Sequence, residues 1–97
     1  MKLLTKTIAK QIPPLYSQEK LGEEAMAYLK LFTPDSNWTW YVTEMDQETG
    51  ECFGLVYGME RELGYFSLPE IERIRGPLGL PVERDRFFEP TPVKDCK

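Results

Sequence analysis

The run WTWYVTEMDQETGECFGLVYGMERELGYF, residues 38–66, carries the clearest structural pattern in the chain. It holds three stretches rich in aromatic and β-branched residues, and short polar segments that contain glycine separate them. Such stretches are typical of β-strands, and loops this short join antiparallel neighbours. We therefore predict strands over 38–45, 51–57 and 61–66, with turns at 46–50 and 58–60.

The flanking sequence predicts one more strand and two helices. AMAYLKLF, residues 25–32, predicts a strand, and the polar cluster at 33–37 predicts the turn that follows it. Thr5 and the apolar residues spaced four apart predict a helix over 5–12, which Pro13-Pro14 ends. A capping pattern that begins at Ser67 predicts a second helix near 68–75.

These elements predict an α+β fold: an antiparallel meander of about four strands, with a short helix before it and a short helix after it. We expect a single α+β domain over residues 1–89. Residues 90–97 contain two prolines, and we expect them to form a flexible C-terminal tail. Residues 82–88 favour neither helix nor strand.

Both faces of the predicted sheet are apolar. Symmetric turns place Trp40 near Val56, and Gly54 near both Val42 and Tyr65. One face then carries Trp38, Trp40, Val42, Val56, Leu63 and Tyr65, and the other carries Tyr41, Met45, Phe53, Leu55, Tyr57 and Phe66. Because two short helices can bury only one face, the other needs cover from the rest of the chain or from a partner.

Composition bears on the chemistry. The 97 residues have a net charge of −4 and no histidine, and residues 21–72 alone carry eleven acids and two bases, a net of −9. This balance disfavours direct binding to nucleic acid and favours a basic partner. Without histidine, and with only Cys52 and Cys96 as thiols, we expect no catalysis, no metal and no cofactor. No apolar run is long enough for a membrane span or a signal peptide, so we expect a cytoplasmic protein.

Two other functions stay open. A small metal-dependent nuclease or hydrolase needs only one or two carboxylates, and Glu44, Asp46 and Glu51 are the candidates. A nucleic-acid-binding module would use the aromatic rings for stacking, although the sequence offers no basic groove.

The candidate binding residues lie mostly at the 33–37 turn. Asp35 and Asn37 stand beside Trp38 and Trp40, which places polar groups at the edge of an aromatic surface. Tyr65 joins them because it is expected to lie above the bare backbone of Gly54. These five residues predict a protein-binding site, and self-association remains an alternative.

Three phrases resemble one known family. They are FTPDSNWTWY (residues 32–41), GYFSLPEIERIRGPLGLPVERD (64–85) and the opening MKLLTK with PPLY at 13–16. Together they resemble the bacterial family called domain of unknown function 2958. The resemblance implies small proteins of plasmids, integrative elements and phage, with no established activity, cofactor or catalytic residue. With the residues above, it predicts a non-enzymatic protein-binding accessory module of a mobile genetic element, acting in transfer or defence evasion.

Overall fold

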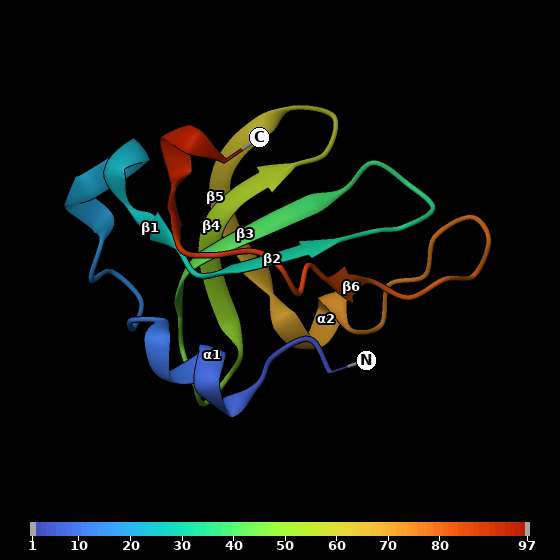
Figure 1. Ribbon diagram of the computed structural model, residues 1–97, viewed down its shortest axis with the longest axis horizontal. Helices are drawn as coiled ribbons and strands as arrows, with labels where there is room; N and C mark the ends of the chain where they lie inside the picture. The colour runs from blue at the N-terminus through green and yellow to red at the C-terminus, as the bar shows by residue number, and fades with distance from the viewer. Residues whose placement is uncertain (1, 97) are drawn as a thin grey trace.

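The order of the elements follows the predicted pattern of a helix, successive strands and a second helix (Figure 1). The computed structural model describes residues 2–96. Its elements in chain order are α1 (Lys6–Gln11), η1 (Glu19–Glu24), β1 (Met26–Ala27), β2 (Leu29–Phe32), β3 (Thr39–Met45), β4 (Glu51–Tyr57), β5 (Arg61–Ser67), α2 (Leu68–Ile71), β6 (Glu83–Arg84), β7 (Thr91–Pro92) and η2 (Val93–Asp95).

The main sheet is antiparallel and has the strand order β5-β4-β3-β2-β6. Strands β2 to β5 pair in sequence order, which confirms the predicted α+β fold with its meander. β6 adds a short fifth strand beside β2, and it comes from the region whose sequence favoured no element type. The predicted strand over 25–32 is divided in two, because β1 leaves the main sheet and pairs with β7.

Both helices begin at the predicted caps. The Ile8 N–H donates to the Thr5 hydroxyl at 3.1 Å, and the Glu70 N–H donates to the Ser67 hydroxyl at 3.3 Å. α2 is shorter than the predicted helix near 68–75, because it ends at Ile71 and gives way to tighter turns. Gly76-Pro77 then leads the chain into a loop.

The predicted register is right between β3 and β4 and wrong between β4 and β5. Trp40 pairs with Val56 and Val42 with Gly54, as expected. Gly54, however, pairs with Gly64 and not with Tyr65. The turn at 58–60 has three residues, as predicted, so Tyr57 pairs with Arg61 and Gly64 lies opposite Gly54.

A bulge at Thr43 also moves side chains between faces. The pairing passes from Val42–Gly54 directly to Glu44–Phe53, so one extra residue lies in β3. Met45 therefore lies on the same face as Trp40, and the shift of β5 brings Phe66 to that face as well. Leu63 and Tyr65 point to the opposite face, which reverses the prediction for all four residues.

Each face of the sheet has its own core. The helix-covered face contacts α1, α2 and the N-terminal residues, and its buried cluster is Leu3, Ile12, Leu29, Leu31, Trp40, Val42, Met45, Cys52, Leu68, Ile71 and Val82. The tail-covered face contacts β1, β7 and η2, and its buried cluster is Ala25, Ala27, Tyr41, Leu55, Val93 and Cys96. Figure 1 shows the two helices below the sheet and the C-terminal segment above it.

The C-terminal segment was predicted to be a flexible tail, and the structure corrects this. Residues 91–95 form β7 and η2, Val93 is fully buried and Cys96 is 3% exposed. The segment packs because Val93 and Cys96 fill the space above Tyr41 and Leu55. Lys97, the last residue of the predicted tail, lies outside the described residues.

Candidate functional site

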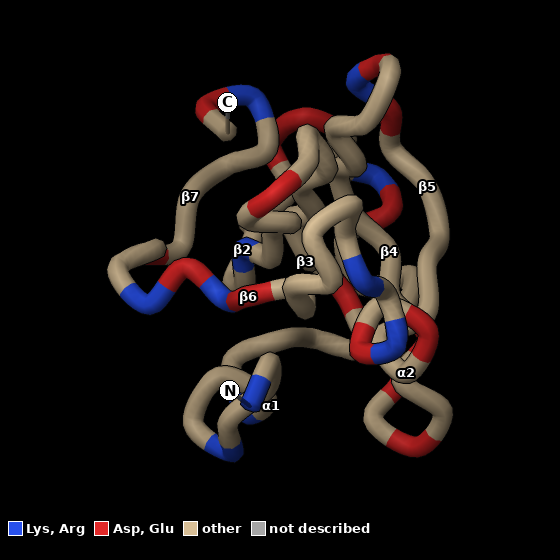
Figure 2. The backbone as a smooth tube through the Cα atoms, turned by 90° about the vertical axis from the view of Figure 1, so that its right-hand side faces the viewer, with Lys and Arg blue, Asp and Glu red and all other residues tan. Residues whose placement is uncertain are grey.

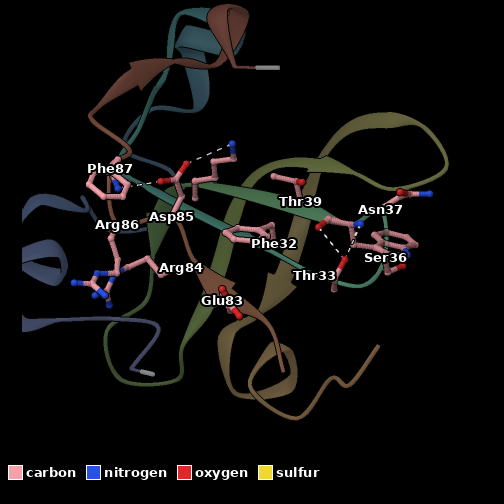
Figure 3. Close-up of a pocket in the computed structure, with 12 residues that line it drawn as sticks. Phe32, Thr33, Ser36, Asn37, Thr39, Glu83, Arg84, Asp85, Arg86 and Phe87 are labelled. Atoms are coloured by element: carbon pink, nitrogen blue, oxygen red, sulfur yellow. Dashed lines mark hydrogen bonds and ion pairs between the residues drawn. The ribbon is translucent and has the colours of Figure 1, made fainter. Parts of the chain in front are cut away.

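A groove of about 760 Å³ lies between the turn that joins β2 to β3 and the segment around β6. In Figure 3, Phe32 points into its middle, residues 83–87 form one wall and residues 36–39 lie at the other end. The charged and aromatic residues that line it are Lys30, Glu83, Arg84, Asp85, Arg86, Phe32, Trp38 and Phe87. The groove therefore offers aromatic surface together with both signs of charge.

Most of the charge in this groove is engaged. The Lys30 ammonium lies 3.6 Å from the Asp85 carboxylate, and the Arg84 guanidinium donates to the Lys2 carbonyl. Arg86 forms no ion pair with any residue in 2–96. Phe87, beside it, is 93% exposed. Arg86 and Phe87 are thus groove residues that are exposed and available to a ligand.

The turn at 33–37 presents Asn37 and Trp38 to this groove. The Trp38 N–H donates to the Thr33 hydroxyl at 3.0 Å, and the Thr33 N–H donates to the Trp38 carbonyl at 2.9 Å. Thr33 is buried, so these bonds hold the turn against the end of the sheet. Asn37 is exposed at the tip, as predicted for a polar group near an aromatic surface.

Asp35 is turned away from the groove and holds a loop. Its Oδ2 accepts the Leu78 N–H at 2.8 Å and the Leu80 N–H at 3.4 Å. Its Oδ1 is buried without a hydrogen-bond partner and lies against Gly76, where a Cβ atom would come within 1.7 Å of it. The carboxylate therefore anchors residues 76–80, a role that the sequence did not indicate.

The two tryptophans are stacked but not equally exposed. Their ring centroids are 6.1 Å apart with an interplanar angle of 19°. Trp38 is 42% exposed and covers the bare backbone of Gly58, whereas Trp40 is 6% exposed and belongs to the core of the helix-covered face. Only Trp38 of the pair is placed to contact a partner.

Tyr65 lies apart from the other predicted residues, on β5. It is 54% exposed, and its ring meets Phe53 edge-on at 4.9 Å. With Tyr16 and Leu63 these residues form an exposed apolar surface that we call the β5 patch: Tyr16, Phe53, Leu63 and Tyr65. The pKa of Tyr65 is raised, first by desolvation and then by the neighbouring Tyr16 hydroxyl.

A small cavity of about 80 Å³ at the β5 patch is lined by Glu44. Glu44 is 3% exposed, and its two oxygens accept the N–H groups of Tyr16 at 2.7 Å and of Gln18 at 2.8 Å. Tyr16 has a φ of 73°, an uncommon backbone conformation for this residue type. Residues 16–18 are thereby fixed against the sheet, and Tyr16 is held in the patch.

Acidic side chains surround the patch. Asp46, Glu51 and Glu70 line a hollow of about 480 Å³ that also contacts Tyr65. Glu19 lines the cavity on the other side. None of these four acids forms an ion pair within residues 2–96. The only base on β5, Arg61, is bonded to Glu23 at 2.7 Å, so the surroundings of the patch are strongly acidic.

Two other kinds of site are absent from the described residues. Between residues 2 and 96, no three carboxylate or thiol groups gather closely enough to hold a metal ion. No helix in the same part of the chain has the length and apolar character needed to cross a membrane.

Comparison with known proteins places the chain in one family. No curated protein and no solved structure matches it significantly. A family profile covers almost its whole length, which confirms the resemblance seen in its sequence. Residues 3–93 match that profile, and the chain therefore belongs to the family described as Protein of unknown function (DUF2958).

Proposed function

We propose that this protein is a non-enzymatic protein-binding module that serves a plasmid or another mobile genetic element in transfer or defence evasion. The link to a mobile element rests on what the sequence resemblance implies. The binding role rests on the surface described above. The proposal places the module in the cytoplasm, where its two buried free thiols would stay reduced.

The observation that carries the binding role is the β5 patch. Tyr16, Leu63 and Tyr65 are 62%, 39% and 54% exposed, and they lie together above a cavity. Interface centres are enriched in aromatic residues, and polar or charged residues surround them. The unpaired acids beside the patch favour a basic partner, because charge of opposite sign steers association.

The patch also changes the expected contact residues. Tyr65 keeps its proposed role, whereas Trp40 is buried in a core and Asp35 is engaged with its loop. Asn37 and Trp38 are exposed, but they belong to the groove at the other edge of the sheet. We therefore propose Tyr65 and its neighbours as the contact region.

A binding experiment with a matched control tests this function. Wild type, Tyr65→Ala and Phe87→Ala are used as baits in cells that carry the element, after circular dichroism shows that all three are folded. Phe87 is an aromatic residue that is more exposed than Tyr65, 93% against 54%, and it lies on another surface. We expect Tyr65→Ala to lose a partner that wild type and Phe87→Ala both retain.

Two outcomes would contradict the proposal. If all three proteins recover the same partners in equal amount, the contact region is wrong. If none recovers a partner and size-exclusion chromatography shows only a monomer, the binding function is wrong. A dimer that Tyr65→Ala dissociates would assign the patch to self-association.

The groove favours a second candidate function, binding of single-stranded nucleic acid. Arg86 and Phe87 offer an available base beside an exposed ring, which is the combination that such binding uses. Glu83 and Asp85 lie in the same wall and weaken the attraction to phosphate. Fluorescence anisotropy with single-stranded and double-stranded oligonucleotides at low salt tests it, and absence of any binding rules it out.

Two of the three carboxylates named for a metal-dependent enzyme have other roles. Both oxygens of Glu44 accept backbone N–H groups, and Asp46 Oδ1 accepts the Glu48 N–H at 2.9 Å within its own loop. A titration with Mg²⁺ or Mn²⁺ that selectively broadened the NMR signals of Glu44, Asp46 and Glu51 would nevertheless support that alternative.

A further inference from the structure

We propose that the outer edge of β5 binds an extended basic segment of a partner protein as an additional strand of the main sheet. This inference rests on the proposed protein-binding function, and it specifies the mode of binding and the chemistry of the partner.

β5 ends the main sheet on one side. The strand order places β4 on its inner side and no described strand on its outer side. Figure 2 shows β5 at the margin of the molecule, with no other chain segment beyond it. At seven residues, β5 is as long as β3 and β4, whereas the opposite edge is formed by β6, which has two residues. β5 therefore provides the long free edge of this sheet.

The ladder shows which backbone groups face outward. The Leu68 N–H donates to the Gly50 carbonyl at 2.9 Å, just beyond the ends of β5 and β4. In an antiparallel pair the hydrogen-bonded positions alternate, so Gly64 and Phe66 bond to β4. The N–H and C=O groups of Leu63 and Tyr65 then point away from β4, toward the free edge. They are the groups that a new strand would pair with.

This edge lacks the features that usually prevent strand addition. Natural edge strands carry prolines, bulges or inward-pointing charges that discourage pairing. Residues 63–66 of β5 contain no charge and no proline, and the β4–β5 pairing has no bulge. Gly64 also has open space where a Cβ atom would lie, which leaves room for a side chain of the added strand.

The charges at this edge identify the occupant. Glu62 lies on β5 itself, Glu19 lies beside Leu63 and Tyr65, and Glu51 lies near the other end of the strand. The base Arg61 is already paired with Glu23. A second copy of this chain would bring like charges together, which opposes self-pairing. A strand that alternates lysine or arginine with apolar residues would satisfy both the acids and the β5 patch.

Defined peptides test the proposal on the intact protein. The probe is a blocked peptide of about eight residues that alternates lysine and valine, long enough for one strand. One control replaces lysine by glutamate, and another keeps the sequence but carries N-methyl groups on alternate residues. The second control keeps every charge of the peptide, but it cannot donate backbone hydrogen bonds along one of its two edges. We expect each control to bind at least about tenfold more weakly.

Two further measurements locate the contact. Amide exchange followed by NMR should show that the N–H groups of Leu63 and Tyr65 become protected when the lysine peptide is bound. Leu63→Pro removes one outward N–H and should weaken peptide binding at least about tenfold more than Leu63→Ala does. The exchange measurement uses wild type, so it holds even where the proline variant fails to fold.

Each contrary outcome is distinct. Equal binding of the N-methylated peptide overturns strand addition, and equal binding of the glutamate peptide overturns the basic partner. Absence of binding by all three peptides overturns the whole inference. If partner capture depends on Tyr65 while Leu63→Pro captures as well as Leu63→Ala, the module binds proteins by another mode. If capture does not depend on Tyr65, the proposed function itself fails at this surface.

Discussion

Glu44 is a buried carboxylate whose charge is balanced by backbone N–H groups. No Lys or Arg in residues 2–96 forms an ion pair with it, and its oxygens instead bind Tyr16 and Gln18. Hydrogen bonds to an ionised group contribute about 1.5–3 kcal/mol each, and loss of one partner leaves the other group unsatisfied. Glu44 therefore stabilises the attachment of residues 16–18 to the sheet.

Glu44→Gln should lower the free energy of unfolding by about 2 kcal/mol, because the amide offers one acceptor where the carboxylate offers two. Glu62→Gln is the matched control, since it removes the same charge from an exposed position on β5. That change should stay within about 0.5 kcal/mol of wild type. Urea denaturation measures both, and equal stabilities of the two variants would contradict this account.

Gly76 and Gly64 are two glycines at which an added Cβ atom should have opposite effects. A Cβ atom at Gly76 would lie 1.7 Å from Asp35 Oδ1, whereas at Gly64 it would meet nothing within 4 Å. We expect Gly76→Ala to cost about 1–3 kcal/mol through overpacking, and Gly64→Ala to be neutral or slightly stabilising.

Thermal denaturation compares the two alanine variants. An NMR spectrum of Gly76→Ala should also show that the Leu78 amide signal has moved, because Asp35 accepts that N–H. If Gly76→Ala is as stable as Gly64→Ala, the stability of the fold does not depend on the present position of the Asp35 carboxylate.

For individual residues, the sequence predicted the local backbone structure better than the role of each side chain. It placed Asp35 and Asn37 correctly in a turn. It could not indicate that the Asp35 carboxylate bonds to Leu78, because these residues are far apart in the chain and no local pattern links them. Trp38 and Trp40 are the same residue type in the same predicted strand. Only tertiary packing decides that Trp40 is buried and Trp38 is exposed.

At the scale of the elements, the strands were predictable because each has a strong local pattern. β4 has the predicted bounds, 51–57, and β3 and β5 differ from their predictions by one residue at one end. Register was less predictable, since the bulge at Thr43 shifts the pairing of β3 by one and β5 pairs one position away from the predicted partner of Gly54. Each shift moves side chains to the other face, which is why Tyr65 joined the wrong set.

β7 and η2 were missed because the segment is short and rich in proline. Their packing depends on Val93, which is fully buried against the tail-covered face. Val93→Ala should lower the free energy of unfolding by about 2 kcal/mol, through lost burial and the cavity that remains. Lys94→Ala is the neighbouring control, because it removes only an exposed ion pair with Glu24 and should cost less than about 1 kcal/mol.

Guanidinium denaturation measures both variants of this segment. If Val93→Ala proves as stable as Lys94→Ala, the C-terminal segment contributes little and behaves as the flexible tail that the sequence predicted. Near-UV circular dichroism should also change for Val93→Ala, because Tyr41 lies in the same cluster.

At the scale of the whole molecule, charge is unevenly distributed along the fold. In Figure 2, α1 carries only basic charges, and the loop that joins β3 to β4 carries only acidic ones. The free edge of β5 belongs to the acidic part, and the groove beside β6 mixes both signs. The sequence predicted an acidic middle region, but only the fold shows that its unpaired acids surround an apolar surface.

The main sheet separates the two thiols, one in each core. Cys52 is fully buried on the helix-covered face, and Cys96 is buried on the tail-covered face. Burial raises the pKa of the Cys52 thiol to about 12 and that of the Cys96 thiol to about 11. We expect a maleimide to label neither thiol readily in the folded protein at neutral pH, and to label both after denaturation.

The raised thiol pKa values also predict how stability changes with pH. In the unfolded chain the thiols ionise near their ordinary pKa of 9.0, while in the folded protein they stay protonated. Ionisation therefore stabilises the unfolded state as pH rises above about 9, and the folded protein loses stability until its own thiols ionise near 11–12. Replacing both cysteines by alanine should remove a loss of about 2.6 kcal/mol between pH 8 and 10. Lysines and tyrosines titrate in both proteins, so the difference between the two stability profiles reports the thiols alone. Parallel profiles for wild type and the double variant would show that the thiols ionise as readily in the folded protein as in the unfolded chain.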